Sequence, residues 1–182
     1  MIEPLHRAVV SLGSNIDKEQ NLPAAVELLR RSATVVAAST VYETAAVGAR
    51  EEQPSYFNAA VLILTEVSPA ELKDGLLADI ERKLGRTRTH DKYAARTIDL
   101  DIALFDNAAF DYVPADGRAR HIPDPDILRF PHVAVPVSEV APNAVHPETG
   151  EPLVAIAGRL LAKATATGQS TFRPRPDIDL TR

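Results

Sequence analysis

The sequence predicts an α+β fold in which an antiparallel β-sheet carries helices on one face. Runs of β-branched and apolar residues indicate four strands within the first 105 residues. Two stretches with apolar residues at helical spacing separate these strands in the order β-α-β-β-α-β. The prolines gather after that pattern, where a less regular structure is expected.

The first half of the pattern lies before residue 56. Residues 8–12 predict a strand, and Gly13-Ser14-Asn15 has the composition of the tight turn that ends it. Residues 21–31 predict a helix because their apolar side chains fall on one helical face. These side chains are Leu22, Ala25, Val26 and Leu29. Residues 34–44, rich in Val and Thr, predict the second strand, and a loop is expected over 45–55.

The second half repeats the sequence of strand, helix and strand. Residues 56–66 predict the third strand. Ser68-Pro69-Ala70-Glu71 then predicts a helix start with an N-cap serine and a capping box, and Gly85 indicates where this helix ends. A polar loop over 86–95 leads to the last strand, residues 96–105. The apolar stripe of the helix consists of Leu72, Leu76, Leu77, Ile80 and Leu84.

This element order is that of the ferredoxin-like arrangement, a fold that hosts many functions. Ten of the fourteen prolines follow Phe105, and their spacing predicts extended segments and turns that wrap the sheet. A last helix is expected over 153–164. Its inward side chains would be Leu153, Ile156, Leu160 and Leu161. We therefore expect one domain over residues 1–166 and a frayed tail over 167–182.

The composition narrows the class of protein. The 182 residues carry a net charge of -5, which argues against a general nucleic-acid binder. The absence of cysteine excludes disulfides and thiolate metal sites, and it fits a cytoplasmic protein. No apolar run approaches the ~18 residues of a membrane span, and the N-terminus has no signal-peptide core. We expect a cytoplasmic monomer without a membrane or nucleic-acid partner.

Two carboxylates mark the last predicted strand. Side chains alternate along a strand, so Asp99 and Asp101 share one face. Two neighbouring carboxylates repel each other, and a divalent cation between them removes that repulsion. Oxygen ligands of this kind suit Mg²⁺, especially when phosphate oxygens complete the coordination. A water-facing edge strand is an equally good interpretation of the pattern alone.

A group of basic residues precedes this strand. Arg86, Arg88, Lys92 and Arg96 fall within eleven residues of an otherwise acidic chain. Such cations can neutralise phosphate oxygens, and arginine can do so through two hydrogen bonds at once. A solvated charged loop is the alternative. The sequence contains neither a P-loop nor a Gly-x-Gly-x-x-Gly motif, so those nucleotide-binding sites are not supported.

A third group of polar residues could form a pocket. Tyr56 and Asn58 share one face of their strand, and Thr44 ends the neighbouring strand. An aromatic ring can stack on a flat heterocycle, and an amide can pair with its donors and acceptors. Ordinary strand packing remains the alternative for Tyr56, as a simple turn does for Gly13-Ser14-Asn15.

Together these segments resemble the 6-hydroxymethyl-7,8-dihydropterin pyrophosphokinase family. The matching segments run in the family's order over residues 8–105 and continue weakly through Pro136, Glu139 and Ala141-Pro142. They are Leu12-Gly13-Ser14-Asn15, Tyr42-Glu43-Thr44 with Val47-Gly48, Gln53 to Val61, Glu81 with Gly85-Arg86-Thr87-Arg88, and Arg96 to Ile102 with Leu104-Phe105. The Arg-Thr-x-Asp-Leu-Asp signature is specific when Tyr-x-Asn-Ala precedes it at this spacing.

The resemblance implies a reaction. The β,γ-pyrophosphoryl group of ATP would pass to the hydroxymethyl group of the pterin, releasing AMP, in folate biosynthesis. Asp99 and Asp101 would bind two Mg²⁺ ions that span the triphosphate. Arg86 and Arg96 would stabilise the transferring group, on loops that close over it.

The resemblance also implies two sets of binding residues. The pterin would lie among Gly13, Thr44, Val47, Tyr56, Asn58 and His132. ATP would be surrounded by Glu81, Arg88, Lys92, Tyr93, Ile102 and Arg129.

The chain departs from the family's pattern between residues 122 and 132. In ungapped register Asp124 replaces a histidine, Phe130 an arginine, and His132 a phenylalanine. Arg129 could supply the cation, and either Phe130 or His132 the stacking ring. A catalytically weak or inactive pterin- or nucleotide-binding paralogue is therefore the alternative function, and an RNA-binding use of the fold is a weaker third.

Overall fold

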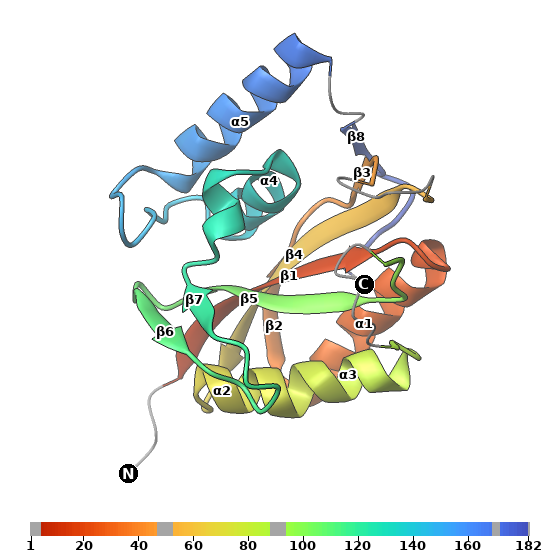
Figure 1. Cartoon of the computed structure of the whole chain (residues 1–182), viewed down its shortest axis with the longest axis vertical. Coiled ribbons are helices and arrows are strands. Elements are labelled where there is room, and N and C mark those ends of the chain that lie inside the picture. Colours follow the sequence, from red (N-terminus) through yellow and green to blue (C-terminus); the bar gives the residue numbers. More distant parts are fainter. Residues whose placement is uncertain (1–4, 47–52, 88–93, 169–171, 182) are drawn as a thin grey trace.

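The computed structural model describes residues 5–46, 53–87, 94–168 and 172–181. It has the predicted α+β architecture, an antiparallel sheet with helices packed on it (Figure 1). Three long strands lie side by side in the order β5-β1-β4, with β5 at the edge of the sheet, and shorter strands continue the sheet beside β4. The strands are β1 (His6–Ser14), β2 (Thr34–Ala38), β3 (Tyr42–Thr44), β4 (Tyr56–Thr65), β5 (Asp99–Phe105) and β8 (Arg173–Pro174).

The second predicted strand, residues 34–44, is divided in the structure. Both of its parts, β2 and β3, pair antiparallel with β4. Between them the backbone and side chain of Ser39 take over the pairing. Ser39 N–H donates to the Ala60 carbonyl, and Ser39 Oγ accepts from Ala60 N–H, both at 2.9 Å. A side-chain hydrogen bond replaces part of the ladder here, which interrupts the regular strand.

One face of the sheet is covered by the two predicted helices. The first is α1 (Lys18–Ser32). The second is continuous through α2 (Pro69–Leu72), the π-helical turn η1 (Lys73–Leu77) and α3 (Ala78–Lys83). The predicted capping box is present at Ser68, and Gly85 follows the helix with φ 72°. The predicted apolar stripes are buried against the sheet in one cluster, which contains Leu22, Leu29, Leu77, Ile80, Val10, Val61, Leu100 and Ile102.

The prediction of helices on one face only is wrong, because the other face of the sheet carries two later helices, α4 (Pro131–Val140) and α5 (Leu153–Thr167) (Figure 1). Helix α4 packs against β1, β2, β3 and β4, and α5 packs on α4. A second apolar cluster lies between these layers. It contains Val9, Ala60, Leu62, Ala103, Leu104, Ile127, Val137, Ile156 and Leu160.

The prediction of only extended segments and turns in the proline-rich region is wrong. Besides α4, this region contains a 3-10 turn, η2 (Pro125–Leu128), and a small hairpin of β6 (Phe110–Tyr112) and β7 (Arg120–Ile122). Pro131 lies in the first turn of α4, where a helix needs no amide donor. Pro136 lies inside α4 but is buried with Ala134, Val137 and Val140, so tertiary packing outweighs its poor helix propensity.

The predicted last helix is present as α5, but the chain after it does not fray as expected. Residues 172–181 return to the sheet, where β8 pairs with β3. Phe172 stacks on Tyr42 with ring centroids 4.5 Å apart, and Leu180 is only 3% exposed. Apolar side chains at Ile178 and Leu180 join the first core cluster, which explains why this tail is held.

Within the described residues, no helix combines the length and apolar character required to cross a membrane.

Candidate active site

A cavity of 240 Å³ opens on the α4 side of the sheet. This volume is just below the ~300–1,000 Å³ of common small-molecule pockets. Its walls come from β1, β3, β4, β5 and the segment that leads into α4. The lining side chains that the sequence predicts as functional are Gly13, Thr44, Tyr56, Asn58, Arg96, Asp99, Asp101 and His132. The fold therefore brings three separately predicted groups of residues to one place.

The two aspartates of β5 share the cavity face, as the strand alternation predicts. Asp99 and Asp101 line the cavity, while Leu100 and Ile102 lie in the core on the opposite face. On the neighbouring strand β1, Gly13 is opposite Asp99. A Cβ at Gly13 would stand 3.8 Å from Asn58 Oδ1 and in contact with the Tyr56 ring, so glycine keeps this part of the cavity open.

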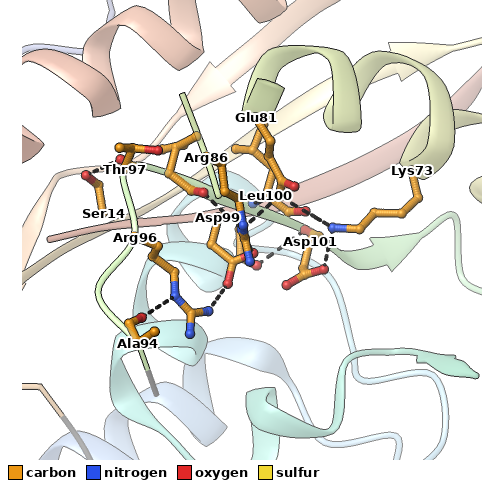
Figure 2. Close-up of polar contacts among 12 residues, drawn as sticks. Ser14, Lys73, Glu81, Arg86, Ala94, Arg96, Thr97, Asp99, Leu100 and Asp101 are labelled. Atoms are coloured by element: carbon orange, nitrogen blue, oxygen red, sulfur yellow. Dashed lines mark hydrogen bonds and ion pairs between the residues drawn. The ribbon is translucent and has the colours of Figure 1, made fainter. Parts of the chain in front are cut away.

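Two arginines hold Asp99. Arg86 Nη1 donates to Asp99 Oδ1, and Arg96 Nη1 donates to Asp99 Oδ2 (Figure 2). Burial opposes ionisation of this carboxyl group, but the positive charges of Arg86 and Arg96 outweigh it and lower the pKa of Asp99 to about 2. Asp99 is therefore ionised at neutral pH, and both of its oxygens already have cationic partners.

The end of β1 fixes the position of the Arg96 backbone. Ser14 Oγ donates to the Thr97 carbonyl at 2.5 Å. Asn15 Oδ1 accepts from the Arg96 N–H at 2.8 Å, and the Asn15 N–H donates to the Arg96 carbonyl at 3.1 Å. The prediction of a tight turn at Gly13-Ser14-Asn15 is wrong, because Gly13 and Ser14 continue β1 and pair with Asn58 and Phe57. Ser14 and Asn15 instead position a predicted catalytic arginine.

The edge of β5 that pairs with no strand within the described residues is hydrogen-bonded by charged side chains from the helix beside it and from Arg86, which follows that helix. Glu81 accepts the Leu100 N–H at 2.9 Å, and Arg86 Nη1 donates to the Ile98 carbonyl at the same distance. Lys73 donates to the Leu100 carbonyl and to Asp101 (Figure 2). Glu81, predicted near ATP, is 2% exposed and supports Arg86 at 3.0 Å from behind the strand.

Lys73 is a buried residue of the site that the sequence pattern does not reveal. Its signal is a positive charge on an apolar helix face, since Lys73 precedes the buried Leu77 and Ile80 by four and seven residues. A lysine at such a position is buried only when it has partners, and those partners are not visible in the sequence.

The predicted pterin residues meet at the paired ends of β3 and β4. Thr44 is opposite Tyr56, and Tyr42 is opposite Asn58. Asn58 Nδ2 donates to Thr44 Oγ1 at 2.9 Å, so the amide is fixed at the cavity wall. The Asn58 amide and the Thr44 hydroxyl are therefore held in place at the wall of the cavity.

His132 forms the opposite side of the same cavity, at the start of α4. Its ring stacks on Phe130 with centroids 5.2 Å apart. Burial lowers the pKa of His132 to about 4, so the ring is neutral at neutral pH. Of the two candidate stacking rings, His132 is the one that lines the cavity.

A second cavity of 410 Å³ adjoins the first. Both cavities are lined by Asp101, Asp124 and Asp126. The second also contains Ile102 and Arg129, two residues predicted to surround ATP. The predicted residues Val47, Arg88, Lys92 and Tyr93 lie outside the described part of the chain.

Asp124 is in a strongly acidic environment between the two cavities. Burial raises its pKa to about 6, and the charges of Asp126, Asp101 and Asp99 add to this effect. A cation placed among these carboxylates would lower the repulsion.

The donor set fits Mg²⁺ carried with a polyphosphate. Asp99 and Asp101 are hard oxygen donors on one strand face. Among residues 5–46, 53–87, 94–168 and 172–181, no group of three or more His, Asp or Glu side chains is arranged to hold a metal by itself. A cation here would need further oxygen ligands, such as those of a triphosphate and water.

Comparisons with known proteins show which family the chain resembles. The family model described as 7,8-dihydro-6-hydroxymethylpterin-pyrophosphokinase matches residues 9–142. A 2-amino-4-hydroxy-6-hydroxymethyldihydropteridine pyrophosphokinase of Synechocystis is 37% identical over 153 residues, which are 82% of this chain and 73% of the relative. The protein of the same name from Bacillus subtilis is 39% identical over 136 residues, 73% of this chain and 77% of the relative.

Solved structures share the fold at low sequence identity. The wild-type Plasmodium falciparum HPPK-DHPS with pteroate superposes with a TM-score of 0.72 at 12% identity, covering 92% of this chain and 44% of that chain. An HPPK-DHPS in complex with substrates gives a TM-score of 0.67 at 14% identity, covering 90% and 45%. The present chain thus spans less than half the length of these structures.

Proposed function

Because the chain belongs to the 7,8-dihydro-6-hydroxymethylpterin-pyrophosphokinase family, we propose that the cavity between β5 and α4 is the site of that reaction. The protein is an ATP-dependent diphosphotransferase of folate biosynthesis. It transfers pyrophosphate from ATP to 6-hydroxymethyl-7,8-dihydropterin and releases AMP. The observation that carries the assignment of the site is the presence of Asp99, Asp101 and Arg96 in one cavity with Tyr56 and Asn58.

The pterin occupies the β3–β4 side of the cavity in this proposal. Asn58 and Thr44 pair with polar groups of the ring, and Tyr56 and the neutral ring of His132 provide aromatic surfaces. Gly13 leaves room for the ring, and Val47 completes the pocket by resemblance. The hydroxymethyl group would then point toward β5.

The nucleotide occupies the β5 side and the adjoining second cavity. Ile102 and Arg129 line that cavity and are proposed to contact ATP. Glu81 acts from behind by holding Arg86 and β5. Arg88, Lys92 and Tyr93 are assigned to ATP by resemblance alone.

The chemistry needs positioning and charge neutralisation more than covalent participation by the protein. Asp99 and Asp101 would hold two Mg²⁺ ions, which supply charge that offsets the phosphate oxygens. Arg86 and Arg96 stabilise the pyrophosphoryl group as the bond between the α,β-bridging oxygen and the β-phosphorus breaks. The walls from β4 and α4 orient the acceptor hydroxyl for attack on the β-phosphorus.

We also propose a more specific fold for the chain. The strand order β5-β1-β4 followed by β2 and β3 supports a ferredoxin-like core with a proline-rich extension. We propose that residues 1–166, together with the tail over 172–181 that pairs with β3, form one pyrophosphokinase-like domain, and that the enzyme is a cytoplasmic monomer. The comparisons do not favour the alternative of an inactive binding paralogue.

The proposed site is tested by removing its two carboxylates separately. Asp99→Ala and Asp101→Ala should each abolish AMP formation from ATP, Mg²⁺ and the pterin while the circular dichroism spectrum stays unchanged. Glu66→Ala, an exposed acidic residue at the far end of β4, is the matched control and should retain full activity. Wild-type activity in either aspartate variant would refute the assignment of the site.

A further inference from the structure

Lys73 is a buried cation that forms an ion pair with Asp101, a proposed metal-binding carboxylate. Its side chain is 3% exposed, and its Nζ lies 2.7 Å from Asp101 Oδ1 and 3.7 Å from Glu81 Oε1. It also donates to the Leu100 carbonyl on the free edge of β5. Figure 2 shows Lys73 reaching Asp101 from the side opposite to the two arginines. A buried lysine with three oxygen partners is held in one position.

The helix carrying Lys73 is locally widened. Lys73 begins the π-helical turn η1, whereas the helix before and after it is α-helical. A π-turn changes the direction of the side chains that it contains, and such turns are frequent at functional sites. Here the widened turn faces the edge of β5, where a side chain of lysine length reaches Asp101.

The four carboxylate oxygens of Asp99 and Asp101 are not equivalent. Arg86 and Arg96 take both oxygens of Asp99, and Lys73 takes Oδ1 of Asp101. Asp101 Oδ2 has no hydrogen-bond partner within the described residues, and the Asp101 side chain is 37% exposed toward the cavities. An incoming cation can therefore bind first at Asp101 Oδ2. The other oxygen of the same carboxylate, Oδ1, is bonded to Lys73.

We propose that Lys73 is a positioning residue that orients Asp101 and, through its fixed positive charge, weakens and limits divalent-cation binding there. The inference rests on the proposed function, because it assigns Asp101 to the metal of the ATP complex. Because Lys73 occupies Oδ1, Asp101 can offer only Oδ2 to a cation. This favours coordination through one carboxylate oxygen, with phosphate oxygens as the further ligands. It also keeps the carboxylate neutralised between turnovers. The lysine itself does not touch the substrates and is not a catalytic residue.

The test combines metal binding with kinetics for Lys73→Met and Lys73→Gln. Binding of Mn²⁺ is measured by electron paramagnetic resonance in the complex with α,β-methylene-ATP, which cannot transfer its pyrophosphoryl group. Loss of a positive charge beside the cation should tighten Mn²⁺ binding about tenfold in both variants. The loss of orientation of Asp101 should lower kcat by about ten- to a hundredfold. A merely structural defect would weaken metal binding and activity together.

The control is Lys83→Met, which removes an exposed lysine of the same helix that pairs with Asp79. It should leave both Mn²⁺ affinity and kcat unchanged. Unchanged affinity in folded Lys73 variants, or weaker affinity, would overturn the proposal. Because Mn²⁺ binding is read without turnover, failure of the wild-type enzyme to form AMP would count against the proposed function alone.

If the Lys73 variants do not fold, a measurement on the wild-type protein tests the proposal. The ¹⁵Nζ resonance of Lys73 should be broadened by Mn²⁺ in the complex with α,β-methylene-ATP, and the resonance of Lys83 should not. An unaffected Lys73 signal at saturating Mn²⁺ would show that the cation does not bind beside Asp101, and the proposal would fail.

Discussion

Asp99 is the residue around which the charges of the site are arranged. Its two oxygens are paired with two arginines, and those charges keep it ionised despite its burial. The arginines are in turn fixed, Arg86 by Glu81 and Arg96 by Asn15. Such preorganised charges do not have to reorient when a phosphoryl group arrives, which is the main way proteins stabilise this kind of transition state.

Replacement of Arg96 tests this arrangement. Arg96→Ala should lower kcat on the order of 10²–10³-fold, because a fixed charge next to the transferring group is lost. Steady-state kinetics of AMP formation measures the effect. Arg82→Ala, on the exposed side of α3, is the control and should behave like wild type. A change in kcat smaller than threefold for Arg96→Ala would remove this residue from the catalytic group.

Asp124 gives a prediction about pH. Its pKa is about 6 in the folded protein, above the usual 3.8. The folded state therefore binds this proton more tightly than the unfolded state, and the ionised group destabilises the fold above pH 6. Asp124→Asn should raise the free energy of unfolding at pH 8 by up to about 3 kcal/mol in the absence of metal. The gain should shrink as the pH falls from 6 to 4 and be absent below it.

Urea denaturation at pH 8 and at pH 4 measures the difference. The asparagine can still accept the Asp126 N–H that Asp124 Oδ1 now accepts at 2.9 Å, so the loop geometry is kept. Equal effects of the substitution at both pH values would contradict the electrostatic explanation. Protein without Mg²⁺ and nucleotide is required, because a bound cation would remove the repulsion.

The sequence predicted residues on one strand better than residues that meet only in three dimensions. Alternation along a strand was sufficient to place Asp99 with Asp101 and Tyr56 with Asn58. It could not reveal Lys73, whose partners are on another element, nor the acidic surroundings of Asp124. Local periodicity predicts on which face of a strand or helix a side chain lies. Contacts between side chains of different elements depend on the whole fold.

At the level of elements, the tail over residues 172–181 supports strand β3, which borders the proposed pterin site. Arg175 Nη1 lies 2.9 Å from Glu43 Oε2, and Lys18 Nζ lies 2.8 Å from Glu43 Oε1. Hydrogen bonds from Lys18 and Ser55 lower the pKa of Glu43 to about 2, and Arg175 adds to them. Glu43 precedes Thr44 on β3, so the tail, α1 and the start of β4 together fix that strand.

Removal of this support should affect the pterin more than ATP. Arg175→Ala should raise KM for the pterin severalfold, change KM for ATP less, and lower the midpoint of thermal unfolding slightly. The matched control is Arg159→Ala on α5, which breaks an exposed ion pair with Glu151. Equal changes in both KM values would show that the tail stabilises the enzyme in general and does not act on β3.

The elements of the first 105 residues were predictable because their local signals agree with the final fold. The capping box at Ser68 and the apolar stripe of the following helix are examples. Helix α4 was missed because Pro136 opposes it locally, and only burial against the sheet overcomes that preference. The tail was missed for the same reason, since Leu180 is buried by contacts distant in sequence.

For the molecule as a whole, the two faces of the sheet differ, since one is covered by an apolar core and the other also carries the cavity. Helices α1 and α2–α3 cover one face with a continuous apolar core. On the other face α4 and α5 cover only part of the sheet, and the cavity with both aspartates lies beside them. The proposed acceptor and donor sites therefore lie next to each other on one face of the sheet, which suits direct transfer between two bound substrates.

The fate of the labelled γ-phosphate tests this account most directly. The enzyme is incubated with [γ-³²P]ATP, Mg²⁺ and 6-hydroxymethyl-7,8-dihydropterin, and the products are separated by chromatography. We predict that the label appears on the pterin as its diphosphate, in equal amount to unlabelled AMP, and that Asp101→Ala forms neither. Release of ADP with the label on a pterin monophosphate, or labelled free phosphate without a pterin product, would contradict the account.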